Sequence, residues 1–404
     1  KSERELQAQI SAVSKILGTA ITPKAEDTSL SAAELEQKYP ERYAVYQNIL
    51  RTQKGGQSLD PAELRRMKEW IDSLNRLSGY IDAHKTDAIE RVLYDKQLTV
   101  FEDISNALEQ GTKEGYVKLP TGSGKTVIFS KFIEVFGGKT LIIVPTKILV
   151  DQTIEKLNKF TSVKAGTYFS EGKDLNQNVT VTTYQSLIRG AGRTINPSAY
   201  HALILDEFHH AEGDKTREAL KKFDCIKLGF SATPGQAALK MKEVHSMSIS
   251  EGVQEGMLCG FTSLIAHTST DLSKVRIVGG EQYDTKQLET AVNNHARNLS
   301  AVQLYQQMFQ DKTAVAYCAG VDHAHDLAEL FRSNGISAAT ITGDTPAQER
   351  TEILKKFKEG EIKALCNARV LIEGFDEPRA SVALNLQPTL SRIVAEQRAG
   401  RVLR

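Results

Sequence analysis

Two acidic residues are followed, after a single phenylalanine, by two histidines in the segment LILDEFHHAEG, which runs from Leu203 to Gly213. Carboxylates and imidazoles are the side chains from which metal sites are built. Three interpretations are open at this point: a zinc site, a magnesium site that serves a nucleotide, or a piece of hydrophobic core. The choice between them depends on what other chemistry the chain carries.

The segment PTGSGKT lies between an expected strand and an expected helix. Its two glycines, Gly122 and Gly124, have no side chains, so backbone N–H groups can surround a phosphate at the N-terminus of the helix. Lys125 is placed to reach the β and γ phosphates, and Thr126 to bind Mg²⁺. The glycine that begins the strict spacing G-x-x-x-x-G-K-[ST] is missing, so this is a shorter form of the loop. The predicted phosphate-binding residues are Thr121, Gly122, Ser123, Gly124, Lys125 and Thr126.

A phosphate loop requires a carboxylate at the end of a neighbouring strand, and the segment LILDE supplies one. We expect Asp206 to hold Mg²⁺ directly or through its water, and Glu207 to orient and deprotonate the attacking water. Zinc is disfavoured because His209 and His210 are adjacent and would not share a face, and because the spacing H-E-x-x-H is lacking. A second metal-like string, DHAHD, is interpreted as a solvated helix turn, since positions i and i+2 of a helix diverge.

Two sets of short β-branched runs, each alternating with helical patterns, must position these residues. This alternation is typical of βαβ units and predicts two successive α/β parallel sheets, with ligands at the carboxyl ends of the strands. The expected strands are 116–119, 140–144, 179–183, 202–205 and 226–230 in the first set, and 313–318, 336–341, 362–366 and 381–386 in the second. The region before them shows helix start signals, at Ser31 with Glu34 and at Asp60-Pro61 with Glu63. We therefore predict a helical domain at 1–90, a first lobe at 91–252, and a linker with a second lobe at 253–404.

The composition is that of an ordinary globular protein of two or three domains, with 404 residues, 40% hydrophobic and 25% charged. No apolar run approaches the length of a membrane span, and the four cysteines form no CxxC pair, which favours a cytoplasmic protein without membrane association. A formal charge of +1 gives no basic field, so a polyanionic partner would be held by local grooves. The chain starts at Lys1, so we expect its start to be trimmed rather than targeted.

Further segments follow the strands in a characteristic order. These are PTKILVDQ, TTYQSL and SATP in the first lobe, and AVAYCAGVDHAHDLAELF, ITGDTPAQERTEILKKFKEGEIKALCNARVLIEGFDEP and QRAGRVLR in the second. Together with the phosphate loop and the segment DEFH, they make the chain from Leu93 to Arg404 resemble the superfamily 2 helicases and translocases of the D-E-x-H type. The chain is most similar to the bacterial group related to XPB, RadD and the motor subunits of restriction enzymes.

The resemblance implies two tandem RecA-like lobes that hydrolyse ATP with Mg²⁺ in the cleft between them. By position in the motifs, His209, Ser231 and Thr233 would couple the lobes together with Gln397. Gly374 and Asp376 would face the nucleotide, and Arg401 and Arg404 would be arginine fingers. Leu93 and Gln97 would lie on the adenine side, in the segment LYDKQ. A channel across both lobes would hold nucleic acid through Thr146, Lys147, Thr183, Gln185 and Thr342.

Several activities are compatible with this resemblance. The leading one is an ATP-driven motor on nucleic acid, with DNA favoured over RNA, acting as a helicase or as a translocase. The alternatives are a nucleic-acid-responsive ATPase switch that separates no strands, and the motor subunit of a restriction-type nuclease. Protein translocation is disfavoured because the chain lacks a long insertion between the motifs. We expect further domains or subunits beyond Arg404.

Overall fold

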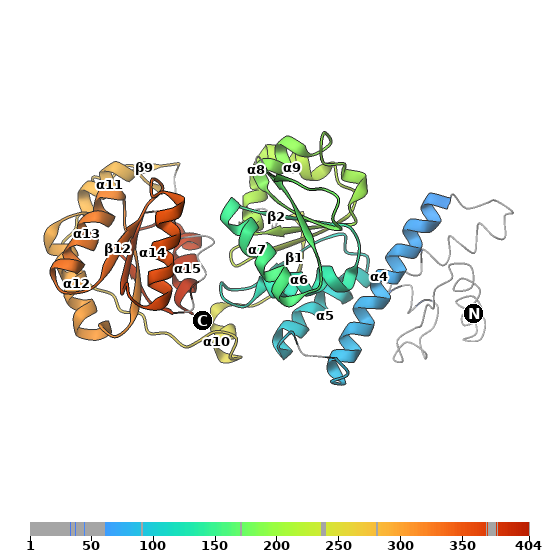
Figure 1. The fold of residues 1–404 in the computed structure, drawn as a ribbon, viewed down its shortest axis with the longest axis horizontal. Coiled ribbons are helices and arrows are strands. Elements are labelled where there is room, and N and C mark those ends of the chain that lie inside the picture. Colours follow the sequence, from blue (N-terminus) through green and yellow to red (C-terminus); the bar gives the residue numbers. More distant parts are fainter. Residues whose placement is uncertain are drawn as a thin grey trace. The chain divides into compact units, whose positions relative to one another are not determined.

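The computed structural model describes residues 61–89, 92–169, 172–235, 240–279, 282–368, 370, 377 and 379–403, and the isolated residues 33, 37 and 44. The predicted helix start at Ser31 and the predicted site residues Gly374, Asp376 and Arg404 lie outside these ranges. The chain forms two compact units (Figure 1), one of Lys1–Leu119 with Gly124–Met247 and the other of Pro120–Ser123 with Ser248–Arg404. The domain limits predicted at residues 90 and 252 stay a prediction.

A mostly parallel sheet forms the core of the first unit, with eight strands among the described residues in the order β4-β3-β5-β2-β6-β7-β1-β8. Every pair is parallel except β3 with β4. The strands are β1 (Glu114–Lys118), β2 (Thr140–Val144), β3 (Ala165–Phe169), β4 (Gly172–Lys173), β5 (Val179–Thr183), β6 (Ala202–Asp206), β7 (Ile226–Ser231) and β8 (Lys242–Ser246).

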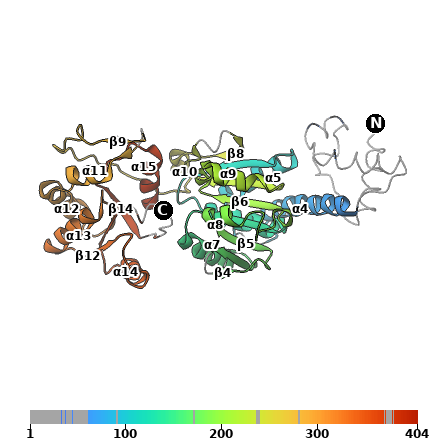
Figure 2. The same ribbon diagram turned by 90° about the horizontal axis from the view of Figure 1, so that it is seen from above.

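The helices cover both faces of this sheet (Figure 2), which explains why β2 and β6 are buried at every position. Leu141, Ile143, Leu203 and Leu205 pack in one cluster with residues of α8 and α9. Helix α6 packs against α4, α5 and α7. The helices are α4 (Pro61–Lys85), α5 (Asp95–Glu109), α6 (Lys125–Phe136), α7 (Lys147–Phe160), α8 (Tyr184–Gly190) and α9 (Asp214–Lys221), with 3-10 turns η2 (Pro197–Ala199) and η3 (Phe208–Glu212).

The second unit contains a four-stranded parallel sheet within the described ranges, in the order β12-β13-β11-β14. Alternate residues of β11 face opposite sides: Ala314 and Ala316 pack with α12 and α13, whereas Val315 and Tyr317 pack with Phe357 of α14. The elements are α10 (Ile249–Gln254), β9 (Ile277–Val278), β10 (Gln282–Tyr283), α11 (Thr285–Val292), α12 (His295–Phe309), β11 (Thr313–Tyr317), α13 (Val321–Ser333), β12 (Ala338–Ile341), α14 (Ala347–Glu359), β13 (Ala364–Asn367), β14 (Ala380–Asn385), α15 (Arg392–Ala399) and the 3-10 turn η5 (Gly400–Val402). Where helices are described, none is long and apolar enough to cross a membrane.

The interpretation of DHAHD as a solvated turn is wrong for His323, which is fully buried in the first turn of α13. Its Nδ1 accepts a hydrogen bond from the backbone N–H of Ala319 at 3.2 Å. Its Nε2 must therefore carry the proton and donate to Asn298 Oδ1, 3.0 Å away. Burial, helped by the charge of Arg297 and opposed by Asp326, lowers the pKa of His323 to about 4.

We expect the second unit to lose stability as the pH falls below about 6.5. The pKa of His323 is lower in the folded chain than the ordinary value of about 6.5, so the unfolded chain binds more protons between these two values. At pH 4 the loss should approach about 3 kcal/mol, because each pKa unit contributes about 1.4 kcal/mol. Chemical unfolding of wild type and His323→Gln between pH 4 and 8 checks this. The glutamine variant should show a smaller loss; equal pH dependence in both proteins would contradict the assignment.

Candidate nucleotide-binding and catalytic site

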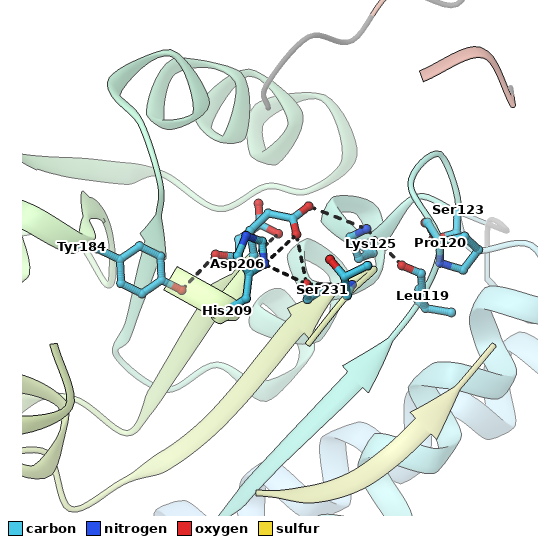
Figure 3. A network of polar contacts seen from close by, with 10 residues as sticks. Leu119, Pro120, Ser123, Lys125, Tyr184, Asp206, His209 and Ser231 are labelled. Carbon is cyan, nitrogen blue, oxygen red and sulfur yellow. Dashed lines mark hydrogen bonds and ion pairs between the residues drawn. The ribbon is translucent and has the colours of Figure 1, made fainter. Parts of the chain in front are cut away.

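The predicted catalytic residues of the first unit come together at one edge of its sheet (Figure 3). Strands β6, β7 and β1 are neighbours and parallel, so their carboxyl ends lie side by side. Asp206 ends β6, Ser231 ends β7, and Leu119 follows β1 directly before the phosphate loop. This is the edge at which ligands bind in open α/β sheets.

The backbone of the phosphate loop requires its glycines. Gly122 and Gly124 have φ values of +94° and +82°, a region that other residues enter only at a cost. Ser123 donates from both its N–H and its hydroxyl to the carbonyl of Pro120, at 3.3 and 2.8 Å. Gly124 then begins α6, and its carbonyl accepts from Val127 N at 2.8 Å. The turn and the helix start are thus the ones expected for a phosphate loop.

Lys125 is held close to the acidic pair. Its side chain is only 9% exposed, its Nζ donates to the carbonyl of Leu119 at 3.1 Å, and it lies 4.0 Å from Glu207 Oε1. The ammonium group of Lys125 thus places a positive charge between the Leu119 carbonyl and the Glu207 carboxylate. It can bind a phosphate oxygen without a large change of position.

Asp206 is buried, and its carboxylate and its backbone carbonyl each accept a hydrogen bond from a neighbouring residue. Its Oδ1 accepts from the N–H of Glu207 at 3.1 Å, and its carbonyl accepts from the hydroxyl of Tyr184 at 2.9 Å. Burial, together with the adjacent charge of Glu207, raises the pKa of Asp206 to about 7, although Lys125 acts in the opposite direction. Tyr184 has a role here that we did not predict, although the segment TTYQSL contains it.

These carboxylates fit a hard divalent cation. Two adjacent acids share one nearby lysine in a largely dry place, so negative charge is in excess there. Mg²⁺ prefers oxygen ligands and keeps several waters and phosphate oxygens, so few protein ligands suffice. Within the described residues, no group of three or more histidine, cysteine, aspartate or glutamate side chains could hold a metal. Asp206 and Thr126 stay the predicted ligands of Mg²⁺.

Glu207 adopts a left-handed backbone conformation, with φ of +46°, which is rare for a residue with a side chain. Such strain persists where the surroundings hold it, and it is frequent at functional sites. Here the Glu207 carboxylate accepts a hydrogen bond from the Ser231 hydroxyl, with Oε2 at 3.1 Å from Oγ. The strained turn therefore presents Glu207 to β7 while Asp206 stays buried.

Three of the four residues predicted to couple the lobes form one hydrogen-bonded group centred on Ser231. The single hydroxyl proton of Ser231 goes to Glu207, so the hydroxyl oxygen accepts from Thr233 N at 3.1 Å. His209 Nδ1 lies 3.2 Å from the same oxygen and must also donate to it, which places a proton on Nδ1. His209 Nδ1 is also 3.6 Å from Glu207 Oε2. The structure thus brings His209, Ser231 and Thr233 together around the acid.

The predicted adenine-side residues lie at the start of α5. Leu93 is buried, and Gln97 Oε1 accepts from the N–H of Tyr94 at 3.1 Å. Gln97 also lies against Gly124, because a Cβ built there would be 2.3 Å from Gln97 Nε2. The structure thus places Gln97 beside the phosphate loop.

Four of the predicted nucleic-acid contacts lie at the ends of the neighbouring strands β2 and β5 or just after them. Thr146 and Thr183 cap α7 and α8 by accepting from Leu149 N and Ser186 N, at 3.4 and 3.2 Å. Lys147 lies over the ring of Phe169, and Gln185 is exposed. In the second unit, Thr342 is 4% exposed, and its N–H donates to Thr345 Oγ1 at 2.9 Å. The threonines therefore already have structural roles in caps and turns, and contact with a polymer stays a prediction.

Two residues predicted from the last motif, Gln397 and Arg401, lie on α15 and η5 of the second unit. Gln397 is 3% exposed, and its Nε2 has no hydrogen-bond partner among the described residues. Arg401 is 8% exposed in η5. Arg398, which we did not predict, donates to the carbonyl of Gln387 at 2.8 Å and lies 5.4 Å from the centre of the Tyr317 ring. Arg398 therefore anchors α15, whereas its neighbours in the motif are the candidates for catalysis.

Comparison with known proteins gives a consistent result. Residues 90–236 match the family described as "Type III restriction enzyme, res subunit", and residues 296–404 match "Helicase conserved C-terminal domain". IRC3 of Saccharomyces cerevisiae, a candidate ATP-dependent helicase, is 32% identical over 78% of this chain, which spans 49% of IRC3. The DNA 3'-5' translocase XPB2 of Sulfurisphaera tokodaii is 24% identical over 83% of this chain and 89% of its own.

Solved structures show the same fold. A fragment of a candidate HsdR subunit of a type I restriction enzyme from Vibrio vulnificus has a TM-score of 0.61 and 18% identity, covering 83% of this chain and 63% of its own. The helicase MrfA bound to DNA has a TM-score of 0.55 and 16% identity, covering 81% and 46%. Dbp5 of Saccharomyces cerevisiae, bound to RNA and ADP BeF3, has a TM-score of 0.52 and 18% identity, covering 85% and 84%.

Proposed function

Because this chain belongs to superfamily 2 of the helicases and translocases, in the group related to XPB and the restriction motors, we propose that it is a nucleic-acid motor driven by ATP hydrolysis. The observation that carries the proposal is the cluster of Lys125, Asp206, Glu207, Ser231 and His209 at one edge of the first sheet. This cluster offers a phosphate ligand, a metal ligand, a base and a connected histidine.

In the proposed reaction, Lys125 and the loop N–H groups bind the β and γ phosphates. Bound Mg²⁺, held by Asp206 and Thr126, would neutralise charge on the phosphate oxygens. Glu207 accepts the proton of the attacking water, because its carboxylate is fixed by Ser231 and lies 4.0 Å from Lys125 Nζ. When Glu207 gains that proton, the hydrogen bond from Ser231 to its carboxylate weakens, and His209 shares the same hydroxyl oxygen. This gives a route from chemistry to the coupling residues.

DNA is the polymer that we propose, held without sequence reading by groups that follow β2 and β5. Support comes from the names of relatives, since XPB2 is a DNA translocase and MrfA was solved with DNA. Phosphate contacts position a polymer without specifying its sequence, so binding should weaken with salt and show little sequence preference. A restriction motor is the second candidate, and it is favoured by the match of residues 90–236 and by the fold of the HsdR fragment.

Directional movement separates a motor from an ATPase switch. DNA that carries biotin at one end and bound streptavidin reports movement, because a motor displaces the streptavidin in an ATP-dependent manner. The proposal predicts displacement from one end only, since a translocase has a fixed direction on a strand. ATP hydrolysis without displacement from either end would contradict the motor and favour the switch. Glu207→Gln is the matched control, because it should bind ATP and displace nothing.

Lys125→Ala should weaken nucleotide binding about a hundredfold or more, because it removes the charge that the loop directs at the phosphates. A fluorescent ATP analogue measures this directly. Lys131→Ala is the matched control: Lys131 is on the same helix, is also 9% exposed, and pairs with Glu134 rather than with the acidic cluster. Equal loss of nucleotide affinity in both variants would mean that α6 had been disturbed rather than the phosphate contact.

A further inference from the structure

The helix before the sheet of the first unit makes a buried hydrogen bond to the segment that starts α5. His84, near the end of α4, is 1% exposed, and its Nε2 lies 2.9 Å from the backbone carbonyl oxygen of Leu93. A carbonyl oxygen only accepts, so the imidazole carries a proton on Nε2 and donates it. We propose that His84 is a positioning residue for the phosphate loop, acting through Leu93 and Gln97. The proposal rests on the proposed function in one respect, which is that this loop binds a nucleotide.

The same peptide unit is held from its other side by Gln97. The carbonyl of Leu93 and the N–H of Tyr94 belong to one peptide group, and that N–H donates to Gln97 Oε1 at 3.1 Å. His84 and Gln97 therefore bind the two ends of a single peptide dipole. A peptide group with both of its hydrogen bonds made inside the protein has little freedom to rotate. Loss of the His84 bond would leave a buried carbonyl without its partner and free this peptide to turn.

Gln97 connects this peptide group to the phosphate loop. Its Oε1 is used on Tyr94, and its Nε2 lies so close to Gly124 that a Cβ at Gly124 would be only 2.3 Å away. Gly124 has φ of +82° and is the residue from which α6 begins. The side chain of Gln97 is 5% exposed, so it cannot move aside into solvent. A shift of the peptide between Leu93 and Tyr94 would therefore be felt at the loop backbone.

Aromatic packing holds His84 in its place on α4. The His84 ring lies 6.0 Å from that of Tyr80, which in turn lies 5.1 Å from Phe101 of α5. Phe101 lies 6.3 Å from Phe132 of α6. These ring contacts connect the end of α4 to α5 and, through Phe101, to α6. Helix α4 is thereby part of the support of the proposed nucleotide site.

Three variants separate positioning from simple stabilisation. His84→Ala removes the donor, and His84→Gln keeps an N–H group at nearly the same reach. Ser73→Ala is the matched control: Ser73 is also buried on α4, and its hydroxyl bonds the carbonyl of Phe136 at 2.9 Å, at the opposite end of α6 from the loop. Each variant is measured for ADP affinity, for KM and kcat of ATP hydrolysis, for melting temperature, and for amide hydrogen exchange of residues 122–126 without nucleotide.

We expect His84→Ala to raise the Kd for ADP and the KM for ATP about five- to tenfold, the effect of one hydrogen bond, with kcat within about twofold. Exchange of the loop amides should become faster. His84→Gln should restore these values to within about twofold, and Ser73→Ala should lower only the melting temperature. Unchanged affinity and exchange in His84→Ala would overturn the proposal. It would also be overturned by equal effects in Ser73→Ala, or by a glutamine variant as impaired as the alanine one. Neither ADP affinity nor amide exchange depends on ATP hydrolysis. A protein that binds ADP but does not hydrolyse ATP would therefore contradict the proposed function and leave the positioning role of His84 standing.

Discussion

Glu207→Gln should lower ATP turnover about a thousandfold while leaving ATP affinity within about threefold of wild type. The amide has the size of the carboxylate, and its oxygen can still accept the hydrogen bond from Ser231 Oγ, so the geometry is kept. It cannot accept the proton of the attacking water, and loss of a general base typically costs about a hundredfold to ten-thousandfold. The left-handed turn at Glu207 is also kept, since the backbone is unchanged.

Single-turnover hydrolysis and equilibrium binding of ATP, measured on the same preparation, check this prediction. Glu218→Gln provides the matched control, because Glu218 is an exposed carboxylate on α9 that pairs with Lys221. Its turnover should equal that of wild type. A Glu207→Gln variant that loses affinity and turnover in equal proportion would show that Glu207 binds ground-state nucleotide instead of acting as the base.

Arg401→Ala should also reduce turnover about a thousandfold with ATP binding nearly intact, which is the effect of removing an arginine finger. The phosphate-loop residues that we assign to nucleotide binding are 121–126. Arg401 is not one of them and belongs to the 3-10 turn η5 of the second unit. In the proposed mechanism, its guanidinium stabilises charge on the γ-phosphate only in the transition state. Lysine at this position should not restore turnover, because a point charge lacks the planar fork that engages two phosphate oxygens.

The competing role for Arg401 is structural. Burial raises the pKa of Tyr317 to about 12, and the positive charge of Arg401 acts on this buried side chain in the opposite direction. Arg401 could therefore contribute to the stability of its own unit. Melting temperature, nucleotide affinity and polymer-stimulated turnover of Arg401→Ala distinguish the two roles. Arg392→Ala is the control, since Arg392 is exposed on α15 and pairs with Glu396. Unchanged turnover together with a lowered melting temperature would contradict the finger role.

The strands could be predicted from sequence where they are buried on both faces. The runs at 140–144 and 179–183 coincide with β2 and β5, because a parallel strand covered by helices on both sides is apolar or β-branched throughout. Three strands at or near the ends of the sheet, β3, β4 and β8, were not predicted. In β3, with the sequence AGTYF, buried and half-buried positions alternate, and β8, with KEVHS, is mostly exposed or half-buried. Their sequences lack the continuous hydrophobic run on which the prediction depended.

The site could be predicted as far as neighbours in sequence define it. Asp206 and Glu207 follow a strand, and the loop glycines precede a helix, so spacing alone suggested their chemistry. Two hydrogen bonds could not be predicted: the one between His209 Nδ1 and Ser231, and the one between His84 and the Leu93 carbonyl. Their partners are 22 and 9 positions apart in the sequence and meet only because separate elements pack together. The prediction for His323 failed for the same reason. The spacing of residues in a helix predicted a solvated turn, but the packing of His323 against Asn298 of α12 buries the His323 side chain.

The most direct test of the central claim is ATP turnover at one fixed salt concentration, measured without polymer and with single-stranded DNA, duplex DNA or RNA. A nucleic-acid motor with the proposed site should turn over slowly alone and at least about tenfold faster with DNA, because the polymer completes the arrangement around the γ-phosphate. RNA should stimulate less than DNA, and Glu207→Gln should abolish the stimulated rate. Turnover that is the same in all four conditions, or no turnover in any of them by a protein that binds ATP, would contradict the account.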